Sequence, residues 1–251
     1  MLTEQRYDEI LKLLHGKGNV TVNELKDFLN ASESTIRRDL NELHKQGKLV
    51  KVFGGAVLAD SQFSSREEVV SLREDVNKNE KIKIAKYAAS LIQEDDFIYL
   101  DAGTTTGYMI DFISIKNVTF VTNAVSHGKR LAELGAKVIL IGGELKSATE
   151  AIVGNEAYVN IQKYNFTIGF WGTNGVSRSA GFTTPEINEA MTKQCAMNRT
   201  KKKYVLCDHT KFHSVAPVTF ADFDSATVIT DQIVNDSYGD CRNVIAVDCR
   251  G

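Results

Sequence analysis

The sequence of 251 residues lacks the features that mark exported and membrane-spanning proteins. Its beginning has no basic start followed by an apolar stretch and a small-residue cleavage site, which together would indicate a secretory signal. No apolar run approaches the roughly 18 residues that cross a bilayer, and the longest runs, such as 138–141, are typical of buried strands. We therefore expect a cytoplasmic protein that has no membrane partner.

Cysteine is scarce, and its spacing does not fit the common structural metal sites. The four cysteines include no CxxC pair and fall within the last quarter of the chain, at Cys195, Cys207, Cys241 and Cys249. Isolated thiols of this kind are typical of reduced, mostly buried cysteines in a cytosolic protein. The sequence therefore predicts neither a metal ion nor another cofactor.

An excess of charge of one sign is also absent. The formal net charge is −2, and 43% apolar with 25% charged residues is the balance of an ordinary soluble globular protein. The first 56 residues hold 9 basic and 8 acidic side chains, and the remainder holds 21 and 24. Binding to a polyanion such as DNA must therefore be argued from where the charges lie rather than from their total.

The first 57 residues have the pattern of three short helices followed by a β wing. Apolar residues recur at helical spacing within 7–14, and Thr21 with Glu24 has the spacing of a capping box before a second helix. Ser32 is a candidate N-cap for a third helix. The expected apolar face of that helix consists of Ile36, Leu40 and Leu43.

The opposite face of the third helix is cationic and hydrogen-bonding, which suits a helix that enters the major groove of DNA. The stretch 48–53 has the β-propensity of a strand, so its two lysines would lie on a wing and contact phosphates. An alternative is that Arg37 and Arg38 only pair with acidic neighbours on a solvated helix. The candidate DNA-binding residues are Ser32, Ser34, Thr35, Arg37, Arg38, Asn41, Lys48 and Lys51.

Beyond residue 80, apolar strands alternate with helices, which indicates an α/β fold with a mostly parallel sheet covered on both faces. The pattern loosens over 58–79, where a linker with a short helix at 67–75 is expected. We predict a DNA-binding domain at 1–57, a linker at 58–79 and an α/β domain at 80–251. The expected strands are 97–100, 118–121, 138–141, 166–170, 204–207, 226–230 and 244–247. The expected helices are 81–92, 107–114, 124–134, 155–163 and 185–200.

Small and polar residues follow several of these strands. The loop DAGTTTGY at 101–108 offers backbone N–H groups and hydroxyls to an anion, although Thr104 would also serve as a helix cap. It is not a Walker loop, because the GxxxxGK[ST] pattern is absent. Since ligands of open α/β sheets bind beyond the carboxyl ends of the strands, this edge is the expected binding site.

The segment SESTIRRDLNELHKQGKLVKVFGGAV at 32–57 resembles the winged helix of the DeoR family of bacterial regulators. It departs from the family pattern at Lys51, where arginine is more usual, and at Phe53, where histidine is common; both changes keep charge or bulk. The later domain resembles the sensor domain of the same family, which is related in fold to ribose-5-phosphate isomerase and the coenzyme A transferases. The resemblance covers nearly the whole chain and implies a winged helix-turn-helix followed by a three-layer α/β sensor domain.

The resemblance implies that the loop 103–106 and Lys211 hold the phosphate of a sugar. Asp101 would either accept hydrogen bonds from sugar hydroxyls or orient the loop, and Asn174 would bind a hydroxyl. The stretch 170–175, which aligns with the catalytic part of the isomerases, holds no carboxylate and so no general base. The candidate effector-binding residues are Asp101, Gly103, Thr104, Thr105, Thr106, Thr122, Asn123, Gly142, Gly143, Asn174 and Lys211.

The segments IGGELKSATEAIVG at 141–154 and KKYVLCDHTK at 202–211 resemble most closely the lactose phosphotransferase operon repressors, which respond to tagatose 6-phosphate. We therefore expect a repressor that binds double-stranded operator DNA as a dimer or tetramer and responds to a hexose phosphate. Two alternatives are a sugar-phosphate isomerase-like enzyme with an accessory winged helix and an interaction module that binds another protein. Glu150, Arg178 and Glu189 lie in segments that would either approach the sugar or face solvent.

Overall fold

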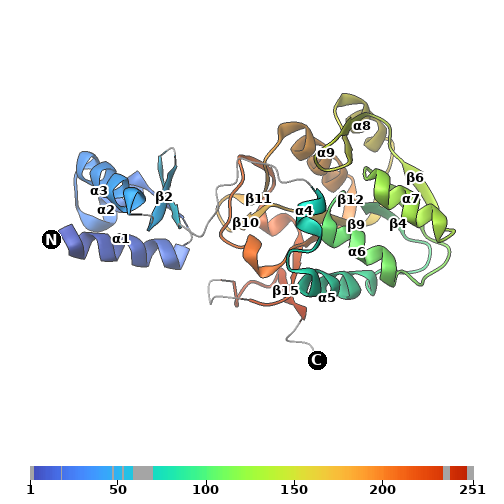
Figure 1. Cartoon of the computed structure of the whole chain (residues 1–251), viewed down its shortest axis with the longest axis horizontal. Coiled ribbons are helices and arrows are strands. Elements are labelled where there is room, and N and C mark those ends of the chain that lie inside the picture. Colours follow the sequence, from blue (N-terminus) through green and yellow to red (C-terminus); the bar gives the residue numbers. More distant parts are fainter. Residues whose placement is uncertain are drawn as a thin grey trace.

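A computed structural model gives the fold of the chain (Figure 1). It describes residues 3–17, 19–46, 48–52, 54–58, 70–233 and 238–247. The expected linker therefore lies outside the described residues between 59 and 69. Its remainder forms the short helix α4 (Val70–Glu74), within the stretch where a helix was expected, and the start of α5 (Lys78–Ala89). No helix among the described residues is both long and apolar enough to cross a membrane.

The N-terminal domain is a winged helix. Its helices are α1 (Thr3–Lys17), α2 (Val22–Leu29) and α3 (Glu33–Lys45), and its antiparallel sheet has the order β1 (Asn19–Thr21), β3 (Gly55–Leu58) and β2 (Leu49–Val52). Strand β1 is only three residues long and was not predicted from the sequence. Its pairing with β3 requires glycine at Gly55, because a Cβ there would lie 2.1 Å from the carbonyl oxygen of Val20.

The predicted helix starts of this domain are confirmed. The Oγ1 atom of Thr21 accepts a hydrogen bond from the Glu24 backbone at 3.1 Å, and the Glu24 carboxylate accepts one from the Thr21 backbone at 2.9 Å. This reciprocal capping box satisfies two backbone N–H groups that the first turn leaves without helical partners. The Oγ atom of Ser32 caps α3 in the same way by accepting from the Thr35 backbone at 3.2 Å. Ile36, Leu40 and Leu43 are fully buried, as their spacing predicted.

The second domain is built on a seven-stranded sheet in which all neighbouring strands are parallel. Their order across the sheet is β15, β14, β12, β9, β4, β5 and β6. The strands are β4 (Phe97–Leu100), β5 (Thr119–Thr122), β6 (Lys137–Leu140), β9 (Phe166–Gly172), β12 (Thr200–Leu206), β14 (Thr227–Thr230) and β15 (Val244–Ala246). Each overlaps a predicted strand, so the expectation of a parallel α/β domain is confirmed.

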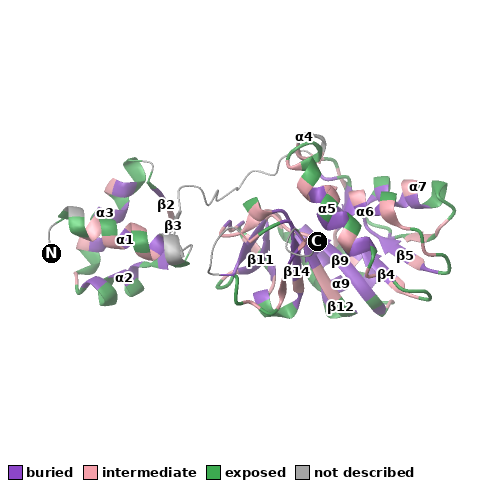
Figure 2. Cartoon of the chain, turned by 90° about the horizontal axis from the view of Figure 1, so that it is seen from below, coloured by how far each residue is buried: buried purple, intermediate pink, exposed green. Residues whose placement is uncertain are grey.

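Both faces of the sheet are covered, and Figure 2 shows its central strands as buried. On one face Ile168 and Phe170 of β9 pack against four elements: α5, α6 (Thr104–Met109), η1 (Ile110–Phe112) and α7 (Val125–Glu133). On the other face Phe166 and Trp171 pack with α8 (Asn155–Ile161) and α9 (Ile187–Asn198). Trp171 stacks on Tyr99, with ring centroids 5.5 Å apart. The result is the expected three-layer α/β arrangement.

Two small antiparallel sheets were not predicted. One pairs β7 (Glu144–Lys146) with β8 (Ala151–Val153), and the other has the order β10 (Gly175–Ser177), β11 (Gly181–Thr184) and β13 (Val218–Ala221). Their strands are only three or four residues long, which is too short for a periodic pattern to stand out. Helix α6 also begins at Thr104, three residues before the expected start of 107, because the glycine-rich loop passes directly into its first turn.

Candidate functional sites

The polar face of α3 is open to solvent. Ser34, Arg37, Arg38 and Asn41 are exposed, while Thr35 is half-buried. Arg37 forms an ion pair with Glu33 one turn earlier, with 2.7 Å between Nη2 and Oε1. Arg38 has no hydrogen bond or ion pair with another residue in the part of the chain that the structure describes. A pair as exposed as Arg37 and Glu33 is weak, so both arginines remain available to a nucleic acid.

Asp39 does not take part in this surface. It is 1% exposed, and its carboxylate receives two hydrogen bonds from Arg6 of α1, at 2.6 and 3.0 Å. Of the acidic neighbours that could pair with the two arginines, Glu33 does pair with Arg37, whereas the carboxylate of Asp39 is bound by Arg6. Its hydrogen bond and charge also raise the pKa of Arg6. The pair fixes α1 against α3 from the inside, which leaves the outward face of α3 cationic.

Side-chain hydrogen bonds link the wing and the third helix, and the His44 ring of α3 contacts the β2 backbone at Leu49 and Lys51. The Nζ atom of Lys51 on β2 donates a hydrogen bond to Oδ1 of Asn41 at 2.7 Å. Lys48, just before β2, is exposed. Ser32 and Thr35 share a hydroxyl contact of 2.8 Å at the start of α3, so the cap and the predicted surface overlap. The structure thus brings the predicted DNA-binding residues to one helix, its N-cap and the adjoining wing.

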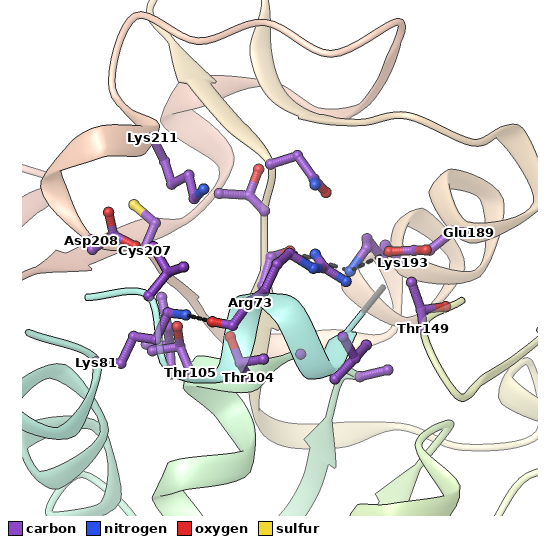
Figure 3. A pocket seen from close by; sticks show the side chains of 18 residues that line it. Arg73, Lys81, Thr104, Thr105, Thr149, Glu189, Lys193, Cys207, Asp208 and Lys211 are labelled. Carbon is purple, nitrogen blue, oxygen red and sulfur yellow. Dashed lines mark hydrogen bonds and ion pairs between the residues drawn. The ribbon is translucent and has the colours of Figure 1, made fainter. Parts of the chain in front are cut away.

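The main pocket of the second domain lies beyond the carboxyl ends of three neighbouring strands, β12, β9 and β4. It encloses about 750 Å³ when the solvent at its mouth is included. Gly103, Thr104 and Thr105 line it after β4, and Thr173 and Asn174 line it after β9. The segment after β12 contributes Cys207, Asp208 and Lys211. In Figure 3, Lys211 and Lys81 lie on one side of the pocket and Lys193 and Glu189 on the other. The predicted sheet edge therefore does hold a pocket.

One end of the pocket is cationic. Lys81 of α5 is 4% exposed and lines this end together with Lys211. Burial lowers the pKa of Lys81 to about 8; Asp208 opposes the shift, while the charges of Lys211 and Arg73 add to it. Thr104 and Thr105 line the same pocket from the start of α6. This end is suited to a phosphate group, which hydroxyls and ammonium groups bind well.

The loop that carries Lys211 is fixed from both sides. Oδ1 of Asp208 accepts hydrogen bonds from the Thr210 backbone at 3.0 Å and from Nδ2 of Asn77 at 3.1 Å. Asp231, at the end of β14, accepts from the backbone and from the ring of His209, both at 2.7 Å. These contacts hold η2 (His209–Lys211) in place, so Lys211 enters the pocket from a rigid turn.

The other end of the pocket rests on a buried charge cluster. Lys193 of α9 is 2% exposed and forms ion pairs with Asp101 and, at 3.3 Å, with Glu189. Oδ2 of Asp101 also accepts a hydrogen bond from the Gly172 backbone at 3.1 Å. Burial raises the pKa of Asp101 to about 6, although Lys193 works in the opposite direction. The cluster joins β4, β9 and α9; Lys193 and Glu189 line the pocket, and Asp101 lies behind them.

Glu189 brings a carboxylate to the pocket lining that the stretch 170–175 lacks. One of its oxygens contacts Lys193 at 3.3 Å and the other contacts Lys146 of β7 at 3.4 Å. Glu189 is buried and lines the pocket rather than facing solvent, whereas Glu150 and Arg178 are exposed.

Six predicted effector residues do not line the pocket. Thr106 is buried, and its Oγ1 donates to the carbonyl oxygens of Asp101 and Gly103. Thr122 and Asn123 are buried one strand further out, where Oδ1 of Asn123 accepts from the Ala102 backbone at 2.9 Å. Gly142 and Gly143 follow β6, at the edge of the sheet. These residues shape the loop after β4 or the sheet edge, and Asp101 lies beneath the pocket rather than in its lining.

Several pocket residues were missed by the sequence analysis. They lie on three helices and two loops: Arg73, Lys81, Thr149, Thr173 and Lys193. A signal existed for Lys193, because Glu189 and Lys193 are one turn apart in a helix that was predicted. The others carry no local motif, since each depends on how distant elements pack.

Among the described residues, neither the cysteines nor any cluster of potential metal-binding side chains forms a second functional site. Cys195, Cys207 and Cys241 form no disulfide among the described residues, and Cys249 lies outside them. Burial raises the pKa of the Cys207 thiol far above its usual value, so it stays protonated. Within the described ranges, no group of three or more His, Cys, Asp or Glu side chains is placed to hold a metal ion.

A winged helix with an open cationic face, followed by an α/β domain with a cationic pocket, defines a transcriptional regulator that carries a ligand-sensing domain. Residues 6–62 match the DeoR-like helix-turn-helix domain, and residues 76–232 match the DeoR C terminal sensor domain. The chain belongs to the DeoR family of transcriptional regulators. This membership confirms the prediction of a DNA-binding regulator rather than an enzyme.

Similar proteins extend over nearly the full length of the chain. The HTH-type transcriptional regulator FruR of Bacillus subtilis (strain 168) is 42% identical over 95% of this chain and 96% of its own length. A lactose phosphotransferase system repressor of Staphylococcus aureus (strain NCTC 8325 / PS 47) is 36% identical over 91% and 92%. Among solved structures, ribose 5-phosphate isomerase A of Methanocaldococcus jannaschii aligns with 54% of this chain and 55% of its own, at 15% identity and a TM-score of 0.41.

Proposed function

We propose that this chain is a repressor of a sugar-utilisation operon and that a phosphorylated sugar bound in the pocket controls its affinity for operator DNA. The observation that carries the proposal is the division of one pocket into two unlike ends. Lys81 and Lys211, with Thr104 and Thr105, offer charge and hydroxyls to a phosphate. Asn174 and the Glu189–Lys193 pair offer donors and acceptors to the hydroxyls of a sugar.

The relatives support a phosphorylated hexose as the effector. The Staphylococcus aureus relative is named as the repressor of a lactose phosphotransferase system, and it is 36% identical to this chain. The segments that resembled such repressors, 141–154 and 202–211, include the strand pair β7–β8 and the loop of Lys211. The ligand would thus contact parts of the chain that carry the likeness. Asn123, which is buried against Ala102, is left out of the proposed binding set.

We propose that α3 and the wing contact double-stranded operator DNA in the cytoplasm. Arg37, Arg38 and Asn41 would face the bases, while Lys48 and Lys51 would meet phosphates. One module of about 57 residues rarely supplies enough affinity for a single genomic site, so the active form would be a dimer or tetramer that reads two half-sites. The chain would act as a DNA-binding unit at 1–57, a connection at 58–79 and a sensing unit at 80–251.

A thermal-shift screen tests the ligand. Tagatose 6-phosphate, fructose 6-phosphate, galactose 6-phosphate and glucose 6-phosphate would be compared with the free sugars and with inorganic phosphate. A ligand at about 100 times its Kd should stabilise the domain by about 2.7 kcal/mol, which corresponds to roughly 5 to 10 °C. A free sugar that shifts Tm as strongly as its phosphate would contradict the proposal, and so would isomerase turnover of any of these phosphates.

A substitution that introduces a negative charge tests the site. Thr105→Glu should abolish the response of operator binding to the sugar phosphate, since the new carboxylate repels a phosphate, while operator affinity without ligand stays unchanged. Thr219→Glu is the matched control, because Thr219 is exposed on β13 and does not line the pocket. Lys211→Ala should weaken the ligand without unfolding the domain. Equal ligand responses of Thr105→Glu and Thr219→Glu would place the phosphate elsewhere.

A further inference from the structure

The short helix α4 supplies one wall of the pocket, and Figure 3 shows its Arg73 between the two ends. The Nε atom of Arg73 is buried and has no hydrogen-bond partner within the described part of the chain. The Oγ1 atom of Thr149, which lines the same pocket and is 8% exposed, also lacks a described partner. Buried polar groups are rarely left in this state, because each costs free energy unless something binds it.

Arg73 and Thr149 belong to one continuous wall. The backbone N–H of Val70, at the start of α4, donates to the carbonyl oxygen of Ala148 at 2.9 Å. Helix α4 is also held through its backbone carbonyls, because Nζ of Lys81 donates to that of Arg73 and Oη of Tyr108 donates to that of Glu74 at 3.2 Å. The backbone of α4 is thus anchored, while the guanidinium of Arg73 keeps an unused donor facing the pocket.

The charges around Arg73 favour an anion as the missing partner. The charge of Arg73 acts on Lys81, and so does that of Lys211, so three cations influence one end of the pocket. Asp208 is the acidic side chain that lines this end, and its Oδ1 is already bound by Asn77 and Thr210. Phosphate oxygens match the donors of a guanidinium, and a dianion would balance the excess of positive charge.

We propose that Arg73, together with Thr149, binds the phosphorylated ligand from the α4 wall and that this contact couples the occupied pocket to operator binding. The inference rests on the proposed function, since it assumes that a sugar phosphate enters the pocket. It adds a residue outside the loops at the sheet edge and a route by which the ligand acts on the winged helix.

The place of α4 in the chain supports the coupling. Val70 is the first described residue after Leu58, which ends β3 of the wing, and eleven residues lie between them. A ligand that binds Arg73 therefore fixes the point at which the connection from the winged helix enters the sensor domain. A ligand shifts an equilibrium only by the difference in its affinity for two states, and a contact on this wall can differ between states while the rigid sheet edge does not.

The test compares Arg73→Ala and Arg73→Lys with the control Lys78→Ala in the full-length chain. Lys78 is an exposed cation at the start of α5 that pairs with Asp75 and does not line the pocket. Calorimetric titration with tagatose 6-phosphate and fructose 6-phosphate gives the ligand Kd. The affinity for operator DNA is then measured without ligand and at saturating ligand. The ratio of these two affinities gives the coupling between the pocket and the winged helix.

Arg73→Ala should raise the Kd of the responsive phosphate by about tenfold or more and should reduce the coupling ratio even at saturation. Arg73→Lys should recover part of the affinity, because it restores the charge but not the Nε–H donor. Lys78→Ala should behave like the wild type. If Arg73→Ala keeps the wild-type Kd, or loses affinity but keeps full coupling at saturation, the inference is overturned. If no phosphate binds the wild type, the proposed function itself has failed.

Discussion

The two polar surfaces of this chain use charge in opposite ways. On α3, Arg37 is exposed, and the ion pair that the structure shows for it is with Glu33, one turn away. Because such an exposed pair contributes little free energy, Arg37 can exchange it and its solvent contacts for DNA at little cost. Beneath the pocket, Lys193 and Asp101 are at most 2% exposed and are bound to each other. Removing an exposed charge should therefore change binding and leave stability alone. Removing a buried charge should first change stability, because its partner is left without compensation.

The largest effect is expected for Lys193→Ala. It leaves Asp101 and one oxygen of Glu189 buried without their cation, which should cost about 3 to 5 kcal/mol of the free energy of unfolding. Urea unfolding of the sensor domain measures this loss. Combining Lys193→Met with Asp101→Asn should restore part of it, since neither charge is then left alone. The control is Lys129→Ala, because Lys129 forms an exposed ion pair with Glu133 on the same helix. An equal loss of stability in this control would contradict the difference between buried and exposed charges.

A smaller loss of stability is expected for Arg6→Ala in the winged helix. Asp39 is 1% exposed and receives two hydrogen bonds from Arg6, whose side chain is 14% exposed. Losing hydrogen bonds to a charged group should destabilise this domain by about 2 kcal/mol. Thermal unfolding is the measurement, and Lys12→Ala on the same helix is the control, because its partner Glu9 is exposed. If Arg6→Ala does not change the thermal stability of the domain, Asp39 does not depend on Arg6 in the way that Asp101 depends on Lys193.

Arg38→Ala should change DNA affinity without changing Tm. A contact to a base edge would cost about 1 to 3 kcal/mol and relax specificity, whereas a phosphate contact would weaken all sequences and lower the salt slope by about 1. Mobility shifts at several salt concentrations separate these cases. Arg37→Ala provides the comparison, since its ion pair with Glu33 must be exchanged for DNA. Normal operator binding by the double variant would exclude α3 as the DNA-contacting helix.

The smallest effect is a pH dependence of ligand binding. The pKa of Lys81 is lowered to about 8 by burial, so raising the pH from 7 to 9 removes its proton. One unit above its pKa, about one Lys81 in ten is still charged, so affinity for a phosphate should fall about tenfold. A phosphate monoester is already a dianion in this range, because its second pKa is about 6. The Lys81→Arg variant should bind the phosphate with nearly the same affinity at pH 7 and pH 9. If its affinity falls with pH as much as that of the wild type, another group is responsible for the pH dependence.

The local part of the architecture could be predicted from the sequence. The capping box of Thr21 and Glu24, the N-cap at Ser32 and the apolar face of α3 are all set by residues within one or two helical turns. The seven parallel strands were found because each is a short apolar run between helices. What a few neighbouring residues determine, a single sequence can reveal.

The pocket depends on strand order, which no short segment encodes. Thr122 and Asn123 lie at the carboxyl end of a strand, as the loop before Thr104 does, yet their strand β5 lies one position further from β9 than β4 does. The pair of Asp101 with Lys193 joins residues 92 positions apart, and the pairing exists only after α9 has packed on the sheet. Thr104, Asn174 and Lys211, which follow the neighbouring strands β4, β9 and β12, were identified from the sequence, whereas Arg73, Lys81 and Lys193 of the helices were not.

The placement of Trp171 has a practical consequence for spectroscopy. The sequence contains a single tryptophan, which is fully buried, stacks on Tyr99 and immediately precedes Gly172 in the pocket lining. Emission excited selectively at the red edge of the indole band therefore comes from one fluorophore at the floor of the pocket. A titration with a sugar phosphate can be followed by this intrinsic light without a label. The winged helix and bound DNA contribute no tryptophan to the signal.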